Sequence, residues 1–498
     1  MLFNSFDFLL FFPLVCLLYF LIPEKLKNYW LLAASYYFYM CWNAKYALLL
    51  LFSTAATFLS GLAMEHIKAQ GRDEGTERRY KNVVVAVCFT VNIGILFFFK
   101  YCNYCLSLLG RLLSVVGIGL SVPAFDIILP VGISFYTFQA LSYTMDVYRG
   151  EIYAEKNFFR YALFVSFFPQ LVAGPIERSK NLLRQLAVPK KFDFDAAKKG
   201  LLLMLWGYFM KLVIADRIAI LVDSVYTEGL PYGGWYLIVA TVLFAFQIYC
   251  DFAGYSTIAI GAAKILNIQL MENFDAPYLS TSVAEFWRHW HISLTSWFKD
   301  YLYIPLGGSR KGTARKYLNK MIVFLVSGLW HGANLTFVVW GGLNGAFQVI
   351  GEMLQPVRDR LVRALNIDRD SLSHRLLKLL VTFALVDFTW IFFRAENISQ
   401  GIEIVRSIFT ASNPWVLFDE SLYALCIDGK NFRLMLLCIG VLLGADCAKK
   451  RGIRISDVIC RQSAVFQMLF IVAAICFILV FGAWGPDFNQ AAFIYFQF

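Results

Sequence analysis

The chain has 498 residues, of which 59% are hydrophobic and only 16% are charged, and its mean hydropathy is +0.60. This composition excludes a soluble globular protein of this length and predicts a polytopic membrane protein in contact with the lipid bilayer. The net charge of +11 comes from short basic clusters between apolar segments rather than from one helix face, which favours membrane topology over nucleic-acid binding.

The first apolar segment, residues 8–22, has no preceding basic residue and no cleavage pattern, so it is expected to be a first span rather than a signal peptide. Further apolar segments cover residues 28–42, 46–64, 83–99, 130–147, 200–222, 235–266, 321–351 as two passes, 376–393, 432–445 and 464–481. Because several are too short or too long for one clean span, we expect an all-α protein with roughly 10–13 transmembrane or re-entrant helices. No soluble linker interrupts the chain, so residues 1–498 are assigned to a single domain.

Lysine and arginine placement predicts the orientation. Basic residues gather at 72–81, 178–191, 299–320 and 449–461, and the positive-inside rule makes these regions cytoplasmic. The N-terminus and the closing residues 482–498 are then expected outside.

His331 is the only residue between positions 321 and 351 that can carry a charge. At about 1.5 Å per helical residue it lies about 16 Å beyond Lys320, near the middle of a hydrocarbon core about 30 Å thick. An imidazole at that depth is costly unless it has a partner or a function. Gly328 and Gly332 beside it allow close backbone approach or a bend. The alternative is a packed histidine that donates to a carbonyl of another helix.

Residues 285–299 (EFWRHWHISLTSWFK) predict an amphipathic helix in the membrane interface. Its polar face would carry Arg288, His291, Thr295 and Lys299, while His289 projects elsewhere and is interpreted as structural. His291 is then either a second site residue or a residue that faces lipid headgroups. The apolar face would consist of Phe286, Trp287, Trp290, Leu294, Trp297 and Phe298.

Other polar residues in or beside the apolar segments are interpreted as pairs that hold the helices together. Asp387 and Arg394 share a helix face but are too far apart for a direct pair. The others are Asp146, Arg149, Lys211, Asp216, Arg217 and Asp251. Cys102 and Cys105 form a CxxC without further ligands at zinc spacing, so no metal site is predicted.

The chain contains no GxSxG elbow, Walker loop or HExxH motif. A buried imidazole stays neutral and can accept a proton, which suits general-base catalysis on a hydroxyl group. Thioester acyl transfer needs little more, because the donor is already activated and a channel could align both substrates.

The run DAPYLSTSVAEFWRHWHISLTSWFKDYLYIPLGGSR from Asp275, followed by SGLWHGANLTFVVWG from Ser327, resembles the signature region of the membrane-bound O-acyltransferase family. More narrowly, the chain resembles the membrane subunit of bacterial alginate O-acetyltransferases and its relatives. Further matches begin at Leu129 (LPVGISFYTFQALSYTMDVYRG), Phe167 (FFPQLVAGPIERSKNLLRQL), Gly207 (GYFMKLVIADRI), Gln247 (QIYCDFAGYS) and Trp390 (WIFFRAEN), and the closing IYFQF fits too. The motif core is about 129–395.

The resemblance implies a ring of helices around a central channel in the bacterial cell membrane, with His331 and His291 as the catalytic histidines. It implies no bound cofactor; acetyl-CoA or another acyl thioester would be the donor substrate from the cytoplasm. An extracytoplasmic partner of the SGNH hydrolase-like type would load the acyl group onto a polysaccharide. Two departures concern substrate detail: Asn344 stands in WGGLNG where many relatives read WGLLHG, and His289 replaces a usual arginine.

We expect His331 to act as general base, with a covalent acyl-histidine as the alternative chemistry. His291 would orient the donor or assist the leaving thiolate. Trp330 and Asn334 would shape the channel, since Asn334 shares the face of His331 if the segment is helical, and Arg288 would contact substrate. The basic loop 299–320 serves either topology or the phosphates of the donor.

Three other functions stay open at the level of the sequence. A secondary transporter should show internal repeats, and none is visible. A noncatalytic scaffold for polysaccharide export would be indifferent to loss of His331. D-alanylation of teichoic acid from a carrier protein is the nearest enzymatic alternative.

Overall fold

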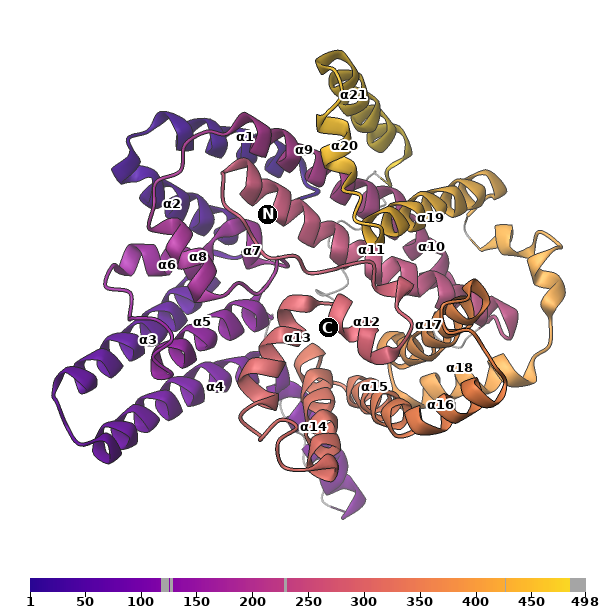
Figure 1. The fold of residues 1–498 in the computed structure, drawn as a ribbon, viewed down its shortest axis with the longest axis horizontal. Helices are drawn as coiled ribbons and strands as arrows, with labels where there is room; N and C mark the ends of the chain where they lie inside the picture. The colour runs from indigo at the N-terminus through magenta and orange to yellow at the C-terminus, as the bar shows by residue number, and fades with distance from the viewer. Residues whose placement is uncertain (118–124, 126–128, 228–230, 426, 484–498) are drawn as a thin grey trace. The chain divides into compact units, whose positions relative to one another are not determined.

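The computed structural model describes residues 1–117, 125, 129–227, 231–425 and 427–483. In this part of the chain the secondary structure consists of helices joined by loops, without strands (Figure 1). The all-α class predicted from the sequence is confirmed. The closing residues 484–498, predicted to lie outside, and the closing IYFQF fall beyond the described residues.

The chain divides into two compact units. One comprises Met1–Leu201 with Ile258–Met271, and the other comprises Leu202–Thr257 with Glu272–Phe498. The single domain expected from the sequence stays a prediction.

In the first unit, α5 (Ile133–Tyr148) is almost completely buried because α3 (Ala44–Ala69) and α4 (Glu74–Val115) pack along it. The hydroxyl groups of Ser60 and Thr144, 3.1 Å apart, join α3 to α5. The other helices of this unit are α1 (Phe6–Leu21), α2 (Lys27–Met40), α6 (Phe158–Ser166), α7 (Phe168–Leu171), α8 (Ser179–Leu186) and the start of α9 (Phe194–Tyr208).

The second unit contains both motif histidines. A π-helical turn, Phe209–Ala215, continues α9 into α10 (Asp216–Val225). Next comes α11 (Trp235–Ile265), whose last residues, from Ile258, belong to the first unit. The later helices of the second unit are α12 (Val283–His289), α13 (Ile292–Phe298), α14 (Thr313–His331), α15 (Leu335–Met353), α16 (Gln355–Ala364), α17 (Leu372–Arg394), α18 (Ile398–Thr410), α19 (Gly429–Lys450), α20 (Ile455–Cys460) and α21 (Ala464–Phe481).

Among the described residues, six helices are long and apolar enough to cross a membrane, namely α3, α4, α11, α17, α19 and α21. The most apolar part of α21 is only 6% buried within the protein, as expected for a helix surrounded by lipid. The remaining predicted segments also form helices, but these are shorter, less apolar or more charged. The protein is therefore a multi-pass membrane protein.

The apolar segment 321–351 forms a hairpin of α14 and α15. Neither helix is among the six long apolar helices, so the two membrane passes predicted here stay a prediction. Glycines allow the two helices to touch: a Cβ atom on Gly328 would lie 2.2 Å from the carbonyl oxygen of Phe337, and one on Gly341 would lie 2.3 Å from that of Phe324. At the charged end of the hairpin, Lys320 Nζ lies 2.5 Å from Glu352 Oε2. His331 is the last residue of α14, at the opposite end, where the chain turns into α15.

We expect Gly341→Ala to destabilise this hairpin by about 1–3 kcal/mol, because the added methyl group meets backbone that cannot rotate away. The measurement is the thermal unfolding midpoint of the purified protein in detergent. Gly342→Ala is the matched control, since a Cβ atom there meets only Leu325 Cδ2 at 3.6 Å. Equal midpoints for the two variants would contradict the close helix contact.

Candidate active site

His331 is buried, and three aromatic rings surround its imidazole. The ring centroids of Trp330 and Trp340 each lie 5.0 Å from that of His331, and the centroid of Phe393 lies 5.4 Å away. All three contacts are edge-to-face, an arrangement that aromatic rings favour. His331 therefore lies in an apolar enclosure built by α14, α15 and α17.

Residues 285–299 do not form the continuous helix predicted from their sequence. They form parts of α12 and α13, and His291 between these helices has left-handed backbone angles, φ 44° and ψ 54°. The predicted apolar face is nevertheless buried. The prediction that His291 shares an outer polar face with Arg288 is wrong: Arg288 is exposed and His291 is buried, because the left-handed turn ends the helical periodicity between them.

Asn273 holds the segment after this turn. Its backbone carbonyl accepts the N–H of Ile292 at 2.9 Å. Its side-chain oxygen accepts the N–H of Ser293 at 3.3 Å and the hydroxyl of Ser293 at 2.9 Å. The same oxygen lies 3.1 Å from His291 Nδ1. One amide side chain thus satisfies three donors of the segment that carries His291.

This contact also selects the tautomer of His291. The N–H of Ser293 can only donate, so the Asn273 atom that it contacts is the oxygen, and an oxygen accepts from a protonated Nδ1. The lone pair of the ring is then on Nε2. Burial lowers the pKa of His291 to about 3, so the imidazole is neutral at neutral pH. In this tautomer Nε2 of His291 is a hydrogen-bond acceptor and not a donor.

Trp330 lies against both histidines. Its ring centroid is 5.0 Å from that of His331 and 6.0 Å from that of His291. Phe252 of α11 also contacts His291, with 4.7 Å between the two ring centroids. The structure therefore brings together His331, His291 and Trp330, three of the residues predicted for the site.

Asn334 has other surroundings, and Arg288 is exposed. The chain is not helical at Gly332–Asn334, so the face that Asn334 was expected to share with His331 does not form. Asn334 caps α15, accepting the N–H of Thr336 at 3.1 Å, and donates to the carbonyl of Glu396 at 2.6 Å.

The basic residues of segment 299–320 differ in their surroundings. Lys316 and Lys320 pair with Glu352 of α15, whereas Arg310, Lys311 and Arg315 are exposed.

Asn344 is fully buried and connects three helices beside the histidines. Its side-chain oxygen accepts the indole N–H of Trp287 at 3.2 Å. Its amide group donates to the carbonyl of Trp340 at 2.9 Å and lies 3.1 Å from the hydroxyl of Thr389. Asn344 thus provides a polar connection between α12, α15 and α17.

The interpretation of the buried charges as pairs is confirmed for one cluster. Lys211 Nζ lies 2.7 Å from Asp216 Oδ1 and 2.6 Å from Asp251 Oδ1. Arg394 pairs with Asp223 at 2.8 Å, not with Asp387, in agreement with the spacing argument. In the described part of the chain no group of three or more His, Cys, Asp or Glu side chains could hold a metal ion.

Sequence reasoning missed Asn273, Trp340, Phe393 and Phe252. Asn273 lies in the loop between α11 and α12, where neither periodicity nor charge marks it. Trp340 and Phe393 belong to quoted motifs, but their relation to His331 depends on how α14, α15 and α17 pack. Nothing in the sequence alone could have located these contacts.

Comparison with known proteins gives consistent similarities. The model of the membrane-bound O-acyltransferase family matches residues 3–393. The chain is 37% identical over 422 residues to the probable alginate O-acetylase of Azotobacter vinelandii, which covers 84% of this chain and 80% of that protein. It is 31% identical over 429 residues to the peptidoglycan O-acetyltransferase of Helicobacter pylori, covering 80% of this chain and 77% of that protein. It is also 28% identical over 234 residues to the teichoic acid D-alanyltransferase of Bacillus subtilis, and this shorter match covers 44% of this chain and 58% of that protein.

We expect Asn344→Leu to destabilise the protein by about 1–3 kcal/mol, because the buried indole N–H of Trp287 loses its acceptor. Thermal unfolding in detergent measures the loss. Adding Trp287→Phe removes the donor as well, so the double variant should lose less than the sum of the two single losses. Strictly additive losses would show that the Trp287–Asn344 hydrogen bond contributes nothing.

Proposed function

Because the chain belongs to the membrane-bound O-acyltransferase family and is a membrane O-acyltransferase, we propose that it transfers an acetyl group from a cytoplasmic thioester to a glycan outside. Acetyl-CoA is the proposed donor. The acceptor hydroxyl belongs to an extracellular or periplasmic polysaccharide, directly or through an SGNH-type partner protein. The names of the alginate and peptidoglycan relatives favour acetyl as the group. The bacterial cell membrane is the proposed location.

The observation that carries the proposal is the contact of His331 and His291 with one indole ring, that of Trp330. Two buried imidazoles that contact the same side chain can act on the two substrates of one reaction, the acceptor hydroxyl and the thioester. Acyl transfer to a hydroxyl group needs a base beside the acceptor and a group that orients the thioester. No bound cofactor is required for this chemistry.

In the proposed reaction, an imidazole nitrogen of His331 takes the proton of the acceptor hydroxyl while its oxygen attacks the thioester carbonyl carbon. The carbon–sulfur bond then breaks, the ester forms, and the thiolate leaves and recovers the proton from His331. With Nδ1 protonated and the ring neutral, His291 carries no proton at Nε2, which supports an orienting role over proton donation to the thiolate from that nitrogen. Trp330 would hold the two histidines at a fixed separation.

The first experiment uses the purified protein in nanodiscs with radiolabelled acetyl-CoA, with cell-envelope glycan and envelope extract as sources of acceptor and partner. We expect CoA release and labelled glycan from the wild type. His331→Ala should lose at least about 100-fold in rate, the usual contribution of a general base. His291→Ala should lose activity as well.

His66→Ala is the matched control, because His66 is exposed at the end of α3 and belongs to the other unit. An active His331→Ala variant would overturn the proposed base. Turnover with D-alanyl carrier protein but not with acetyl-CoA would replace acetyl transfer by D-alanyl transfer, the activity named for the Bacillus subtilis relative.

Asn273→Ala should lower kcat about tenfold with little change in KM, since a small displacement of His291 is enough for such a loss. Steady-state kinetics with acetyl-CoA measures both constants. Asn334→Ala removes a comparable cap contact from α15 and serves as the comparison. A larger kcat loss in Asn334→Ala than in Asn273→Ala would favour Asn334 as the site residue.

A further inference from the structure

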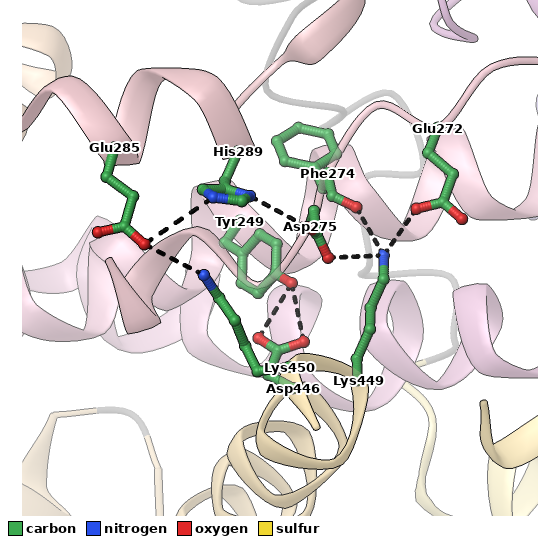
Figure 2. A network of polar contacts seen from close by, with 9 residues as sticks. All are labelled: Tyr249, Glu272, Phe274, Asp275, Glu285, His289, Asp446, Lys449 and Lys450. Atoms are coloured by element: carbon green, nitrogen blue, oxygen red, sulfur yellow. Dashed lines mark hydrogen bonds and ion pairs between the residues drawn. The ribbon is translucent and has the colours of Figure 1, made fainter. Parts of the chain in front are cut away.

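The last turns of α19 carry three side chains, Asp446, Lys449 and Lys450, that contact the segments around His291 (Figure 2). We call these three side chains the α19 latch. The family model ends at residue 393, so α19 lies beyond the matched region. The match therefore assigns this helix no part in the site.

Lys449 contacts the chain on both sides of Asn273. Its Nζ lies 2.9 Å from Glu272 Oε2, 3.0 Å from the carbonyl oxygen of Phe274 and 3.4 Å from Asp275 Oδ1. Figure 2 shows the lysine reaching these three groups from α19. One ammonium group thus fixes the residue before Asn273 and the two residues after it.

The same loop is joined to α12 immediately before His291. The N–H of Asp275 donates to the carbonyl of His289 at 3.0 Å, and Asp275 Oδ2 lies 3.1 Å from His289 Nδ1. Lys450 Nζ lies 3.4 Å from Glu285 Oε1, also on α12. The α19 latch therefore contacts both segments that meet at His291.

Asp446 connects α19 to α11. Both of its carboxylate oxygens accept the hydroxyl of Tyr249, at 3.1 and 3.2 Å. Tyr249 packs on Phe274, with centroids 5.8 Å apart. Asp446 therefore joins α19 to α11, and α11 also carries Phe252, which contacts His291.

Two of the carboxylates that face the lysines, Asp275 and Glu285, have lowered pKa values. Burial opposes ionisation of Asp275, but Lys449 and His289 outweigh it and hold the pKa of this carboxyl below its usual value. Burial likewise opposes ionisation of Glu285, and hydrogen bonds from Thr281 together with Lys450 lower its pKa. Depressed carboxyl pKa values mean that these contacts persist at neutral pH and weaken only as acid protonates the carboxyls.

His291 needs such support because its backbone is strained. A residue other than glycine with φ 44° persists only where the surrounding structure fixes it. Asn273 contacts this strained segment directly. Lys449 in turn contacts the residues on both sides of Asn273. The ion pairs are partly exposed and therefore contribute little to the free energy of unfolding, so losing them should leave the fold intact.

We propose that the α19 latch positions His291 for the reaction, and that Lys449 is a positioning residue that acts through Asn273. The catalytic part of this proposal rests on the proposed acyltransferase function. The structural part does not, because it concerns the order of residues 272–293 alone.

The test compares Lys449→Met with Lys449→Arg, which keeps the charge, and with Lys430→Met at the exposed opposite end of the same helix. Hydrogen–deuterium exchange read by mass spectrometry follows peptides containing Ile292 and Ser293, whose amides donate to Asn273. Acetyl-CoA turnover gives kcat and KM for each variant. A Lys449→Met/Asn273→Ala double variant completes the set.

We expect faster exchange of these peptides in Lys449→Met but not in Lys430→Met, and a kcat lower by about tenfold at unchanged KM in Lys449→Met. Lys449→Arg should restore most of both, and Lys449→Met should cost little more once Asn273 is already alanine. Unchanged exchange in Lys449→Met would overturn the latch. Faster exchange of Lys449→Met with full activity would overturn the positioning role of Lys449. A wild type that turns over no acyl donor would overturn the proposed function, and the exchange measurement would still test the α19 latch.

Discussion

The side-chain oxygen of Asn273 accepts from the amide and hydroxyl of Ser293 and contacts Nδ1 of His291. This single group stabilises a left-handed turn that a histidine would otherwise avoid, and it decides which ring nitrogen carries the proton. Without the turn, α12 and α13 would run on as one amphipathic helix and His291 would face outward with Arg288. The candidate site therefore depends on a residue that belongs to neither histidine motif.

The position of His331 depends on backbone contact between α14 and α15. Lipid provides no hydrophobic driving force between helices, so close packing of small residues takes its place. Gly328 and Gly341 remove the side chains that would separate the two helices. The turn that follows places His331 among Trp330, Trp340 and Phe393, and Trp330 then reaches His291.

Polar groups buried in this apolar protein are compensated locally. Lys211 lies between two aspartates, and Asn344 bonds to Trp287, Trp340 and Thr389. Such groups are costly in a low-dielectric interior unless they are paired. The α19 latch follows the same rule nearer to solvent, where weaker ion pairs suffice to order a loop without dominating stability.

The composition and the apolar segments determined the all-α membrane class, because long continuous apolar segments in lipid satisfy their backbone hydrogen bonds as helices. The motifs determined the family and singled out His331 and His291. The isolation of His331, the one titratable side chain between positions 321 and 351, could be read from spacing alone. The broken helix at His291, the end of α14 at His331 and the roles of Asn273 and Lys449 were decided by tertiary structure. They depend on contacts between segments far apart in sequence, which override helical periodicity and which no local pattern encodes.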